Sequence, residues 1–506
     1  MLMSFLRRLG TQCIPAKFIL FPYSTGRYAL SALCLTAVIG APVVTAQSLP
    51  SGNIDKALKA NKINNEALSA VTIPLTGAGK SAYMNADILI NPASTMKLVT
   101  TYAALELLGP NFQWKTEFFT DGTLKDGVLD GNLYLKGGGD PKLNMERLWL
   151  LLRDLRANGV RHISGDLILD RSHFAPPPVS VFDDDKNDLN KPFLVEPDSL
   201  LVNFKSQRFV VRGEESGAQV VMEPPIGSIQ IINNVKLKQA KNCNSPLISY
   251  VPNDDGHILT LTINGHIAPG CSTQNYLALL DHSRYAAGVV RSIWQEMGGT
   301  ILGNDMLGAT PKDARLLVRA YSPDLVEVIR DINKYSNNTM AKQLFLSIGA
   351  RFRTAADSDD AVAARRVIND FFTKKKIFTN GFVVENGSGL SRHERISARQ
   401  LGLMLEAAWK SPYAAEFISS LPIVAMDGTM RRRLRNSQLV GQAHIKTGTL
   451  KNVRAIAGYS RDVNGDAWAV VAIINHPQPW GGSAILDQVL LDVYRQPKNI
   501  STSTGR

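Results

Sequence analysis

The stretch Ala93-Ser94-Thr95-Met96-Lys97-Leu98 places a serine and a lysine three residues apart where a long helical pattern begins. Apolar residues then recur with helical spacing until Gly109-Pro110, so the pattern predicts a helix from about Thr95 to Leu108. Side chains three apart lie on the same face of a helix, so Lys97 can reach back to the Ser94 hydroxyl. The stretch therefore suggests a nucleophile beside its own base.

Taken alone, this pattern is weak. Serine and lysine at this spacing occur by chance roughly once or twice in a chain of about 500 residues, so a capped surface helix is the simpler explanation. A catalytic reading requires a neutral amine, which burial or a second nearby cation favours by lowering a lysine pKa. The amide N–H groups at the start of the helix also support a catalytic role, because they can stabilise an oxyanion.

The first 46 residues carry four basic residues, no acidic residue and an apolar run from Tyr28 to Ala46. This pattern is typical of an export signal and predicts a periplasmic protein. Because the run is almost long enough to span a bilayer, an uncleaved anchor is the alternative. Cys34 lies inside the run and is interpreted as part of it.

The composition is that of a globular protein, with 44% hydrophobic and 20% charged residues. The formal net charge is +12, and the chain remains basic without its first 46 residues. Such a charge suits an anionic polymer or a membrane surface as a partner. Export and the absence of a binding motif argue against nucleic acid.

Beyond the apolar run only two cysteines remain, Cys243 and Cys271. An even pair in an exported chain predicts a disulfide. No grouping of cysteine and histidine has the spacing of a zinc site, so we expect neither a metal ion nor another cofactor.

From Phe112 to about Ile301 the pattern changes to short alternating runs separated by turn residues, which predicts a strand-rich insert. One helical stretch, Met145 to Asn158, interrupts it. Helical periodicity then returns after Ser322.

Two further polar motifs lie in the C-terminal half. Tyr335-Ser336-Asn337-Asn338 occupies a turn between two helical patterns, and Lys446-Thr447-Gly448-Thr449 lies on the first of three predicted antiparallel strands. A glycine at position 448, inside a strand, suggests the close approach of another backbone. Taken alone, the first motif is better explained as a helix cap and the second as a solvated edge-strand lysine.

Together, Ser-x-x-Lys, Ser-x-Asn and Lys-Thr-Gly in this order resemble the penicillin-binding proteins and serine β-lactamases. The long separation of Ser94 from Ser336 resembles the class C low-molecular-mass penicillin-binding proteins, the D-alanyl-D-alanine carboxypeptidase/endopeptidase family. Three further segments also look like that family; they are Gly137 to Pro141, Gly387 to Arg392 and Asp427 to Thr429. One departure is Asn386 before Gly387, where the family usually has an aspartate.

The resemblance implies an α+β fold, in which a transpeptidase-like domain with an antiparallel sheet flanked by helices is split by the insert. The expected parts are a signal or anchor (1–46), the catalytic domain (47–110 and 300–497), one or two inserted domains (111–299) and a disordered tail (498–506).

The resemblance also implies roles for individual residues in the hydrolysis of peptidoglycan stem peptides. Ser94 attacks, Lys97 takes its proton, Ser336 relays a proton to the leaving amine and Asn338 holds the substrate amide. Lys446, Thr447 and Thr449 meet the terminal carboxylate, and the N–H groups of Ser94 and Thr449 bind the oxyanion. β-Lactam antibiotics would then be covalent inhibitors.

Two other functions are possible, one with the same catalytic residues and one without catalysis. A β-lactamase or esterase has the same three motifs but is usually more compact, and fast turnover of a β-lactam would identify it. A non-catalytic wall-binding protein would work through the insert and form no acyl-enzyme.

A further expectation concerns the side chain of the substrate. The pattern Asp170-x-Ser-x-Phe174 resembles a family segment that projects from the insert towards the active site. Asp170 would then read the ammonium of a wall diamino acid, Arg392 its carboxylate and Phe174 its aliphatic stem. Alternatively, Asp170 is a turn residue and Arg392 a solvated cation.

Overall fold

The structure is a computed structural model that describes residues 47–48, 51–178, 180–182, 191–240, 242–243 and 247–495. The predicted export signal (1–46) and the predicted tail (498–506) lie outside the described residues. Within the described ranges, no helix is both long enough and apolar enough to cross a membrane.

The catalytic part is built on a six-stranded sheet in the order β1-β3-β2-β21-β20-β19, antiparallel except for the pair β1–β3. Its strands are β1 (Gln47–Ser48), β2 (Leu68–Pro74), β3 (Ala82–Met84), β19 (Ala443–Leu450), β20 (Val453–Arg461) and β21 (Ala467–Asn475). The sheet thus joins the two ends of the described chain, and strands far apart in the sequence pair directly.

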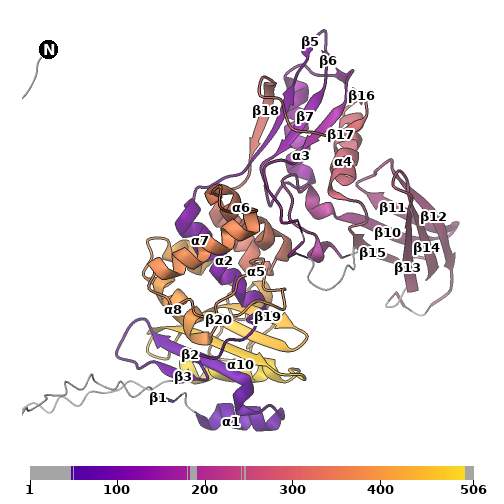
Figure 1. The fold of residues 1–506 in the computed structure, drawn as a ribbon. Coiled ribbons are helices and arrows are strands. Elements are labelled where there is room, and N and C mark those ends of the chain that lie inside the picture. Colours follow the sequence, from indigo (N-terminus) through magenta and orange to yellow (C-terminus); the bar gives the residue numbers. More distant parts are fainter. Residues whose placement is uncertain are drawn as a thin grey trace, which may run out of the picture. The chain divides into compact units, whose positions relative to one another are not determined.

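Helices cover both faces of this sheet (Figure 1). The helices α1 (Ser51–Ala60) and α10 (Gly482–Tyr494) lie on one face. The other face carries α2 (Lys97–Leu108), α5 (Leu325–Tyr335), α6 (Asn338–Phe352), α7 (Asp360–Lys374), α8 (Ala398–Trp409) and α9 (Ala414–Ser419). This double cover explains why β21 is an almost uninterrupted apolar run: Val471 packs against one core and Val470 against the other.

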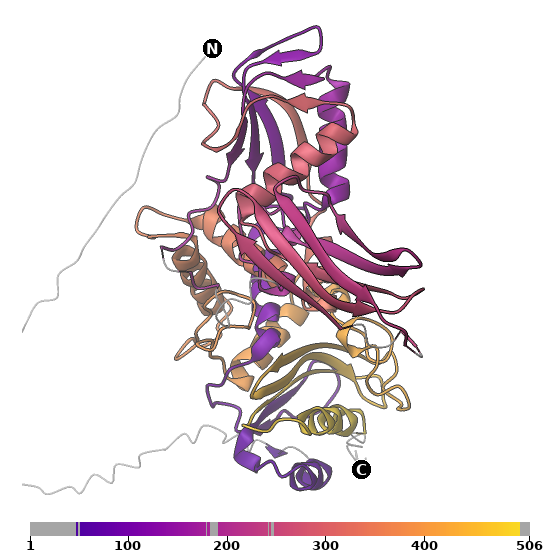
Figure 2. The same ribbon diagram turned by 90° about the vertical axis from the view of Figure 1, so that its right-hand side faces the viewer.

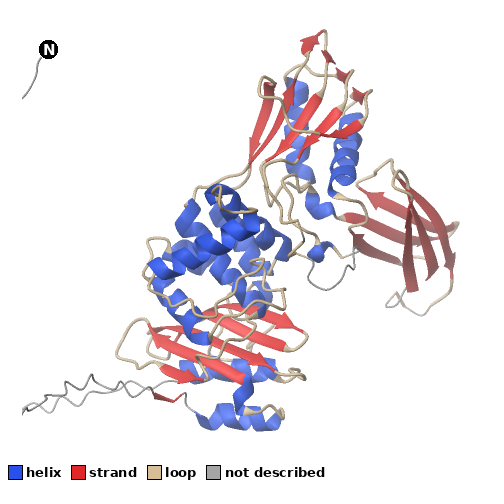
Figure 3. Cartoon of the chain, viewed as in Figure 1, coloured by secondary structure: helices blue, strands red, loops and turns tan. Residues whose placement is uncertain are grey.

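Among its described residues the insert contains four sheets and two α-helices, and Figure 3 shows its mixed part and its all-strand part. The mixed part holds the sheets β17-β9-β7-β4-β18 and β16-β8-β6-β5 with the helices α3 (Met145–Ala157) and α4 (His282–Glu296). Its strands are β4 (Lys115–Thr120), β5 (Thr123–Lys125), β6 (Val128–Asp130), β7 (Leu133–Gly137), β8 (His162–Ile163), β9 (Leu167–Asp170), β16 (Thr300–Ile301), β17 (Asp305–Leu307) and β18 (Arg315–Tyr321).

The all-strand part consists of two three-stranded sheets, β11-β10-β15 and β12-β14-β13 (Figure 2). Its strands are β10 (Gln207–Glu214), β11 (Gly217–Glu223), β12 (Ile229–Leu237), β13 (Leu247–Asp254), β14 (Leu259–Ile267) and β15 (Ser272–Leu277). A disulfide joins Cys243 to Cys271, which confirms the predicted pairing.

The C-terminal boundary of the insert differs from the expected residue 299. Strands β16, β17 and β18 pair with β8, β9 and β4, all of which belong to the insert. The chain returns to the first domain at Ser322, which lies beside Trp114. The Ser322 hydroxyl accepts a hydrogen bond from the Trp114 N–H at 3.0 Å, and the Ser322 N–H donates to the Trp114 carbonyl at 2.9 Å. The insert therefore runs from about residue 115 to 321, since strand pairing, which the sequence does not display, decides the boundary.

The helix α4 was not expected inside a strand-rich insert. Asp281 caps its N-terminus by accepting hydrogen bonds from the N–H groups of Ser283 and Arg284. Its buried face, including Val289 and Trp294, packs into the core of the insert. Otherwise the observed α+β architecture agrees with the sequence expectation.

Candidate active site

Ser94 lies in a short 3-10 turn, Ala93–Met96, that leads directly into α2. The helix thus begins at Lys97, two residues later than predicted, and the Ser94 hydroxyl caps no backbone N–H. Instead it accepts a hydrogen bond from the Lys97 side-chain amine, with Nζ 3.0 Å from Oγ. The predicted pairing of nucleophile and base is present.

Lys97 is completely buried and is held by two more oxygen atoms. Its Nζ lies 2.7 Å from the Asn338 Oδ1 and also donates to the carbonyl of Ser388. Three acceptors around one amine fix its position against the Ser94 oxygen. Asn338 is thereby placed in the site by a contact with the base itself.

Ser336 and Lys446 form the second polar pair of the site. Ser336 ends α5 in a left-handed conformation, with φ 57°, a costly choice for a residue other than glycine. This turn directs its hydroxyl to Lys446, whose Nζ lies 2.8 Å from Oγ and 2.7 Å from the Thr447 carbonyl oxygen. The pKa of Lys446 lies well below its ordinary value, because burial disfavours the cation and Lys97 adds a second positive charge nearby.

Two glycines let other backbones reach the nucleophile. A Cβ on Gly448 would lie 2.9 Å from the Pro92 carbonyl oxygen and 3.1 Å from the Ser94 nitrogen. A Cβ on Gly389 would lie 2.0 Å from the Ala93 carbonyl oxygen. The predicted close approach of another backbone at Gly448 is confirmed, and the neighbour is the nucleophile's own turn.

The threonines on β19 lie towards the open side of the site. The Thr447 hydroxyl is 2.8 Å from that of Thr429, which belongs to the turn before β19, and Thr449 is exposed. These two positions leave hydroxyl groups available to a ligand that lies along the strand edge.

The insert touches the site through the segment that precedes β10. The Asn338 amide nitrogen lies 3.4 Å from the Phe193 carbonyl oxygen, and the Gln343 side chain of α6 accepts from the Asp198 N–H at 3.0 Å. An amide whose nitrogen faces Phe193 presents its oxygen to Lys97. The insert therefore helps to orient Asn338.

Asp170 and Phe174, which were expected to contact the substrate side chain, are both buried in the structure. The Asp170 carboxylate is 1% exposed and accepts from the Ser172 N–H and hydroxyl and from the Thr310 N–H. Phe174 is 5% exposed, with its ring against the position of a Gly139 side chain. The turn reading of Asp170 describes these hydrogen bonds, and the contact of both residues with a substrate stays a prediction.

Arg392 is exposed and lies four residues after Ser388, whose carbonyl contacts Lys97. Its predicted contact with a substrate carboxylate therefore stays a prediction. The neighbouring Asn386 forms the local turn by accepting from the N–H and hydroxyl of Ser388, so the departure from the family pattern keeps this turn intact.

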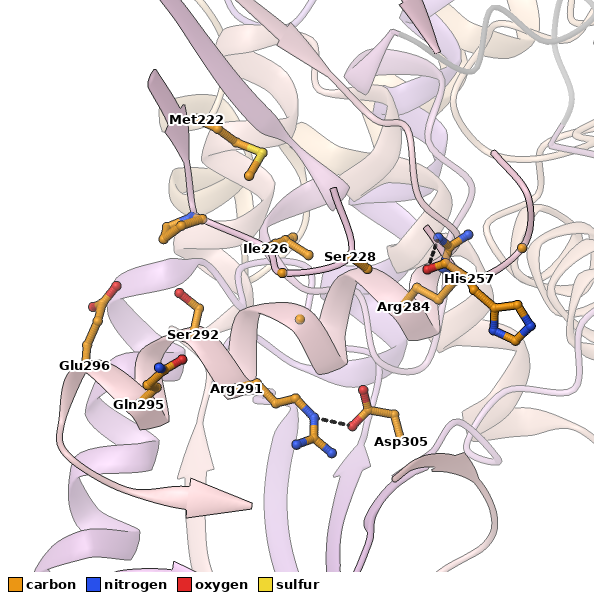
Figure 4. Close-up of a pocket in the computed structure, with 14 residues that line it drawn as sticks. Met222, Ile226, Ser228, His257, Arg284, Arg291, Ser292, Gln295, Glu296 and Asp305 are labelled. Atoms are coloured by element: carbon orange, nitrogen blue, oxygen red, sulfur yellow. Dashed lines mark hydrogen bonds and ion pairs between the residues drawn. The ribbon is translucent and has the colours of Figure 1, made fainter. Parts of the chain in front are cut away.

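A cavity of about 850 Å³ lies away from these residues, between α4 and the turn before β12 (Figure 4). Its arginines are already paired, Arg291 with Asp305 at 2.7 Å and Arg284 with Asp254 at 2.8 Å. It contains none of the predicted site residues.

Sequence reasoning missed two contributors to the site, the carbonyl groups of Ser388 and Phe193. A backbone carbonyl leaves no mark in residue type, so only the fold reveals its position. In the part of the chain that the structure describes, no three or more His, Cys, Asp or Glu side chains are grouped so as to hold a metal ion.

Comparison with known proteins agrees with this geometry. The chain is 26% identical over 409 residues to D-alanyl-D-alanine carboxypeptidase DacB of Haemophilus influenzae, covering 77% of this chain and 81% of that protein. It is 28% identical over 426 residues to a D-alanyl-D-alanine carboxypeptidase of Actinomadura sp. (strain R39), covering 80% and 77%, respectively.

Solved structures show the same fold. The crystal structure of penicillin binding protein 4 (dacB) from Haemophilus influenzae matches with a TM-score of 0.74 at 23% identity, over 88% of this chain and 100% of that one. The same protein complexed with a β-lactam matches with a TM-score of 0.69 at 22% identity, with the same coverage. A family model for D-Ala-D-Ala carboxypeptidase 3 (S13) matches residues 51–490, and the chain is therefore a serine peptidase of that family.

Proposed function

We propose that the protein hydrolyses peptidoglycan stem peptides through an acyl-enzyme at Ser94, acting as a D-alanyl-D-alanine carboxypeptidase, endopeptidase or both in the periplasm. The observation that carries the proposal is the contact of 3.0 Å between the Lys97 Nζ and the Ser94 Oγ. Family membership supplies the substrate class, and the positive charge of the chain suits an anionic wall polymer.

The first half of the reaction forms an ester. Ser94 Oγ attacks the carbonyl carbon of the penultimate D-alanine while neutral Lys97 takes the hydroxyl proton. The N–H groups of Ser94 and Thr449 would stabilise the negative oxygen, and loss of one such donor costs on the order of 3 kcal/mol. The carbon–nitrogen bond then breaks, and a proton relayed through Ser336 allows the amine to leave.

The second half consumes one water molecule. Water attacks the ester carbon, its hydroxyl stays on the new carboxyl group, and its proton returns to the Ser94 oxygen. Lys446, next to Ser336, would hold the carboxylate of the leaving residue together with Thr447. An anion bound there also favours the protonated form of Lys446, whose pKa burial and Lys97 lower in the free enzyme.

β-Lactams are expected to acylate the same serine, because they present a reactive carbonyl and a carboxylate at a similar separation. The Haemophilus relative complexed with a β-lactam supports this expectation.

The test is release of D-alanine from a pentapeptide that ends in D-Ala-D-Ala, measured for the unmodified protein and for Ser94→Ala. We expect release by the first and none by the second. Equal release by both would reject Ser94 as the nucleophile, and release by neither would reject the substrate class.

A further inference from the structure

A second cavity opens beside the Lys446 end of the site. Its volume is about 360 Å³, and it is lined by Tyr335, Gly428, Thr429, Arg431 and Arg432. Tyr335 immediately precedes Ser336, and the Thr429 hydroxyl contacts that of Thr447 at 2.8 Å. The cavity therefore adjoins the place where the leaving residue would lie.

Its charge is positive and uncompensated. Arg431 and Arg432 are both exposed, and across the described ranges neither side chain forms an ion pair with a carboxylate. The nearest acid in the sequence, Asp427, is held by Lys334 at 2.6 Å and by the Ile423 N–H at 2.7 Å. Its charge is thus balanced by Lys334.

The next arginine along the chain, Arg433, has a structural role because it forms an ion pair. Arg433 pairs with Asp487 of α10 at 2.5 Å. The arginines of the cavity in Figure 4 are likewise paired with carboxylates. Arg431 and Arg432 differ from these arginines because both are exposed and line the cavity beside Tyr335 and Thr429.

The chemistry of the leaving group indicates what they bind, an argument that rests on the proposed function. If Lys446 and Thr447 hold the carboxylate of the leaving residue, a single D-alanine ends there and leaves the cavity empty. The leaving residue of a cross-linked substrate continues instead into a second stem peptide. That peptide carries additional free carboxylates and an aliphatic diamino acid chain.

We propose that Arg431 and Arg432 bind carboxylates of this second stem peptide, while the exposed Tyr335 ring covers its aliphatic part. The cavity is then a leaving-group subsite that favours cleavage of cross-links over release of D-alanine. Two exposed cations act mainly through Coulomb attraction, so the preference falls as ionic strength rises.

The experiment compares two substrates with the full-length protein purified as the wild type and as the double variant Arg431→Gln/Arg432→Gln. One substrate is a cross-linked muropeptide dimer and the other is the monomeric pentapeptide, with kcat/KM measured for each at low and high salt. Penicillin acylation is recorded in parallel as a check on the catalytic centre. Arg461→Gln, which removes an equally exposed arginine of the same domain outside the cavity, is the matched control.

We expect the double variant to lose about tenfold in kcat/KM on the dimer at low salt, with little change on the pentapeptide or in acylation. The variant Arg431→Lys/Arg432→Lys should recover most of the loss, since two cations remain. Arg461→Gln should resemble the wild type on both substrates.

The inference is overturned by an unchanged ratio of dimer to pentapeptide cleavage, or by an equal loss on both substrates and in acylation. A wild-type enzyme that releases D-alanine but leaves the dimer intact would also overturn it, while the proposed carboxypeptidase function would stand. A wild type inactive on both substrates would defeat the proposed function as well.

Discussion

Lys97 and Lys446 donate hydrogen bonds to different serines, and this difference separates the expected roles of the two lysines in the site. Lys97 touches the Ser94 oxygen, whereas Lys446 touches Ser336 and lies at the side where a carboxylate would bind. We therefore predict that Lys97 removes the proton of Ser94 and that Lys446 recognises the charge of the substrate. Both amines are buried, so each depends on the oxygen atoms that surround it.

Replacing the two lysines should give unequal results. Lys97→Ala removes the base and should slow acylation by penicillin by roughly 10²- to 10⁴-fold. Lys446→Arg keeps a cation and should lose clearly less, although a guanidinium does not reproduce the geometry of an ammonium. Stopped-flow acylation at neutral pH measures both, and a Lys97→Ala enzyme as fast as the wild type would move the base elsewhere.

Gly448 should tolerate no side chain, because its Cβ would press on the Pro92 carbonyl and on the nucleophile's own nitrogen. We expect Gly448→Ala to slow acylation by up to about a hundredfold through displacement of the Ser94 turn. Gly227→Ala is the matched control, since a Cβ there meets no atom within 4 Å. Similar acylation rates for the two variants would show that the close approach does not matter for catalysis.

At the scale of the elements, local patterns predicted strands of the catalytic sheet and helices that cover it. The strands β19, β20 and β21 were expected from their apolar runs and an Asn-Gly turn, and all three are present. The helix α4 was missed although Tyr285, Val289 and Ile293 recur with helical spacing on its buried face, because it lies within a long stretch of strands. The sequence also named Asp170 as a site residue but did not predict that it is buried and accepts a hydrogen bond from the Thr310 N–H, 140 positions along the chain.

The turn after β7 contains a buried acid, Asp140, which gives an element-scale prediction. Burial raises the pKa of Asp140 to about 6, although the Lys142 N–H and the Arg147 cation oppose the shift. A carboxyl whose folded pKa lies above its unfolded value favours folding below the unfolded pKa of about 4, and that contribution is lost as pH rises through about 6.

Asp140→Asn should therefore stabilise the protein relative to the wild type more at pH 7 than at pH 4, by about 3 kcal/mol. The difference is measured by urea unfolding of both proteins at several pH values. Asp154→Asn, on the exposed face of α3, serves as the control and should show no such trend. A pH-independent difference for Asp140→Asn would contradict the assignment.

At the scale of the whole molecule, the insert belongs to the catalytic apparatus through α6. That helix begins with Asn338 at the site. Its Gln343 side chain accepts a hydrogen bond from the Asp198 N–H of the insert. Its Ser347 hydroxyl accepts one from the Trp114 indole N–H, with 2.8 Å between Nε1 and Oγ. Composition and strand patterns predicted that an insert exists. They did not predict these contacts, since each joins residues that are more than a hundred positions apart.

Formation of the acyl-enzyme at Ser94 is tested most directly by covalent labelling of the whole protein with a labelled penicillin, followed by peptide mapping. We expect one stable ester, on Ser94, that is absent from Ser94→Ala. A label on any other residue, or labelling that persists in Ser94→Ala, would contradict it.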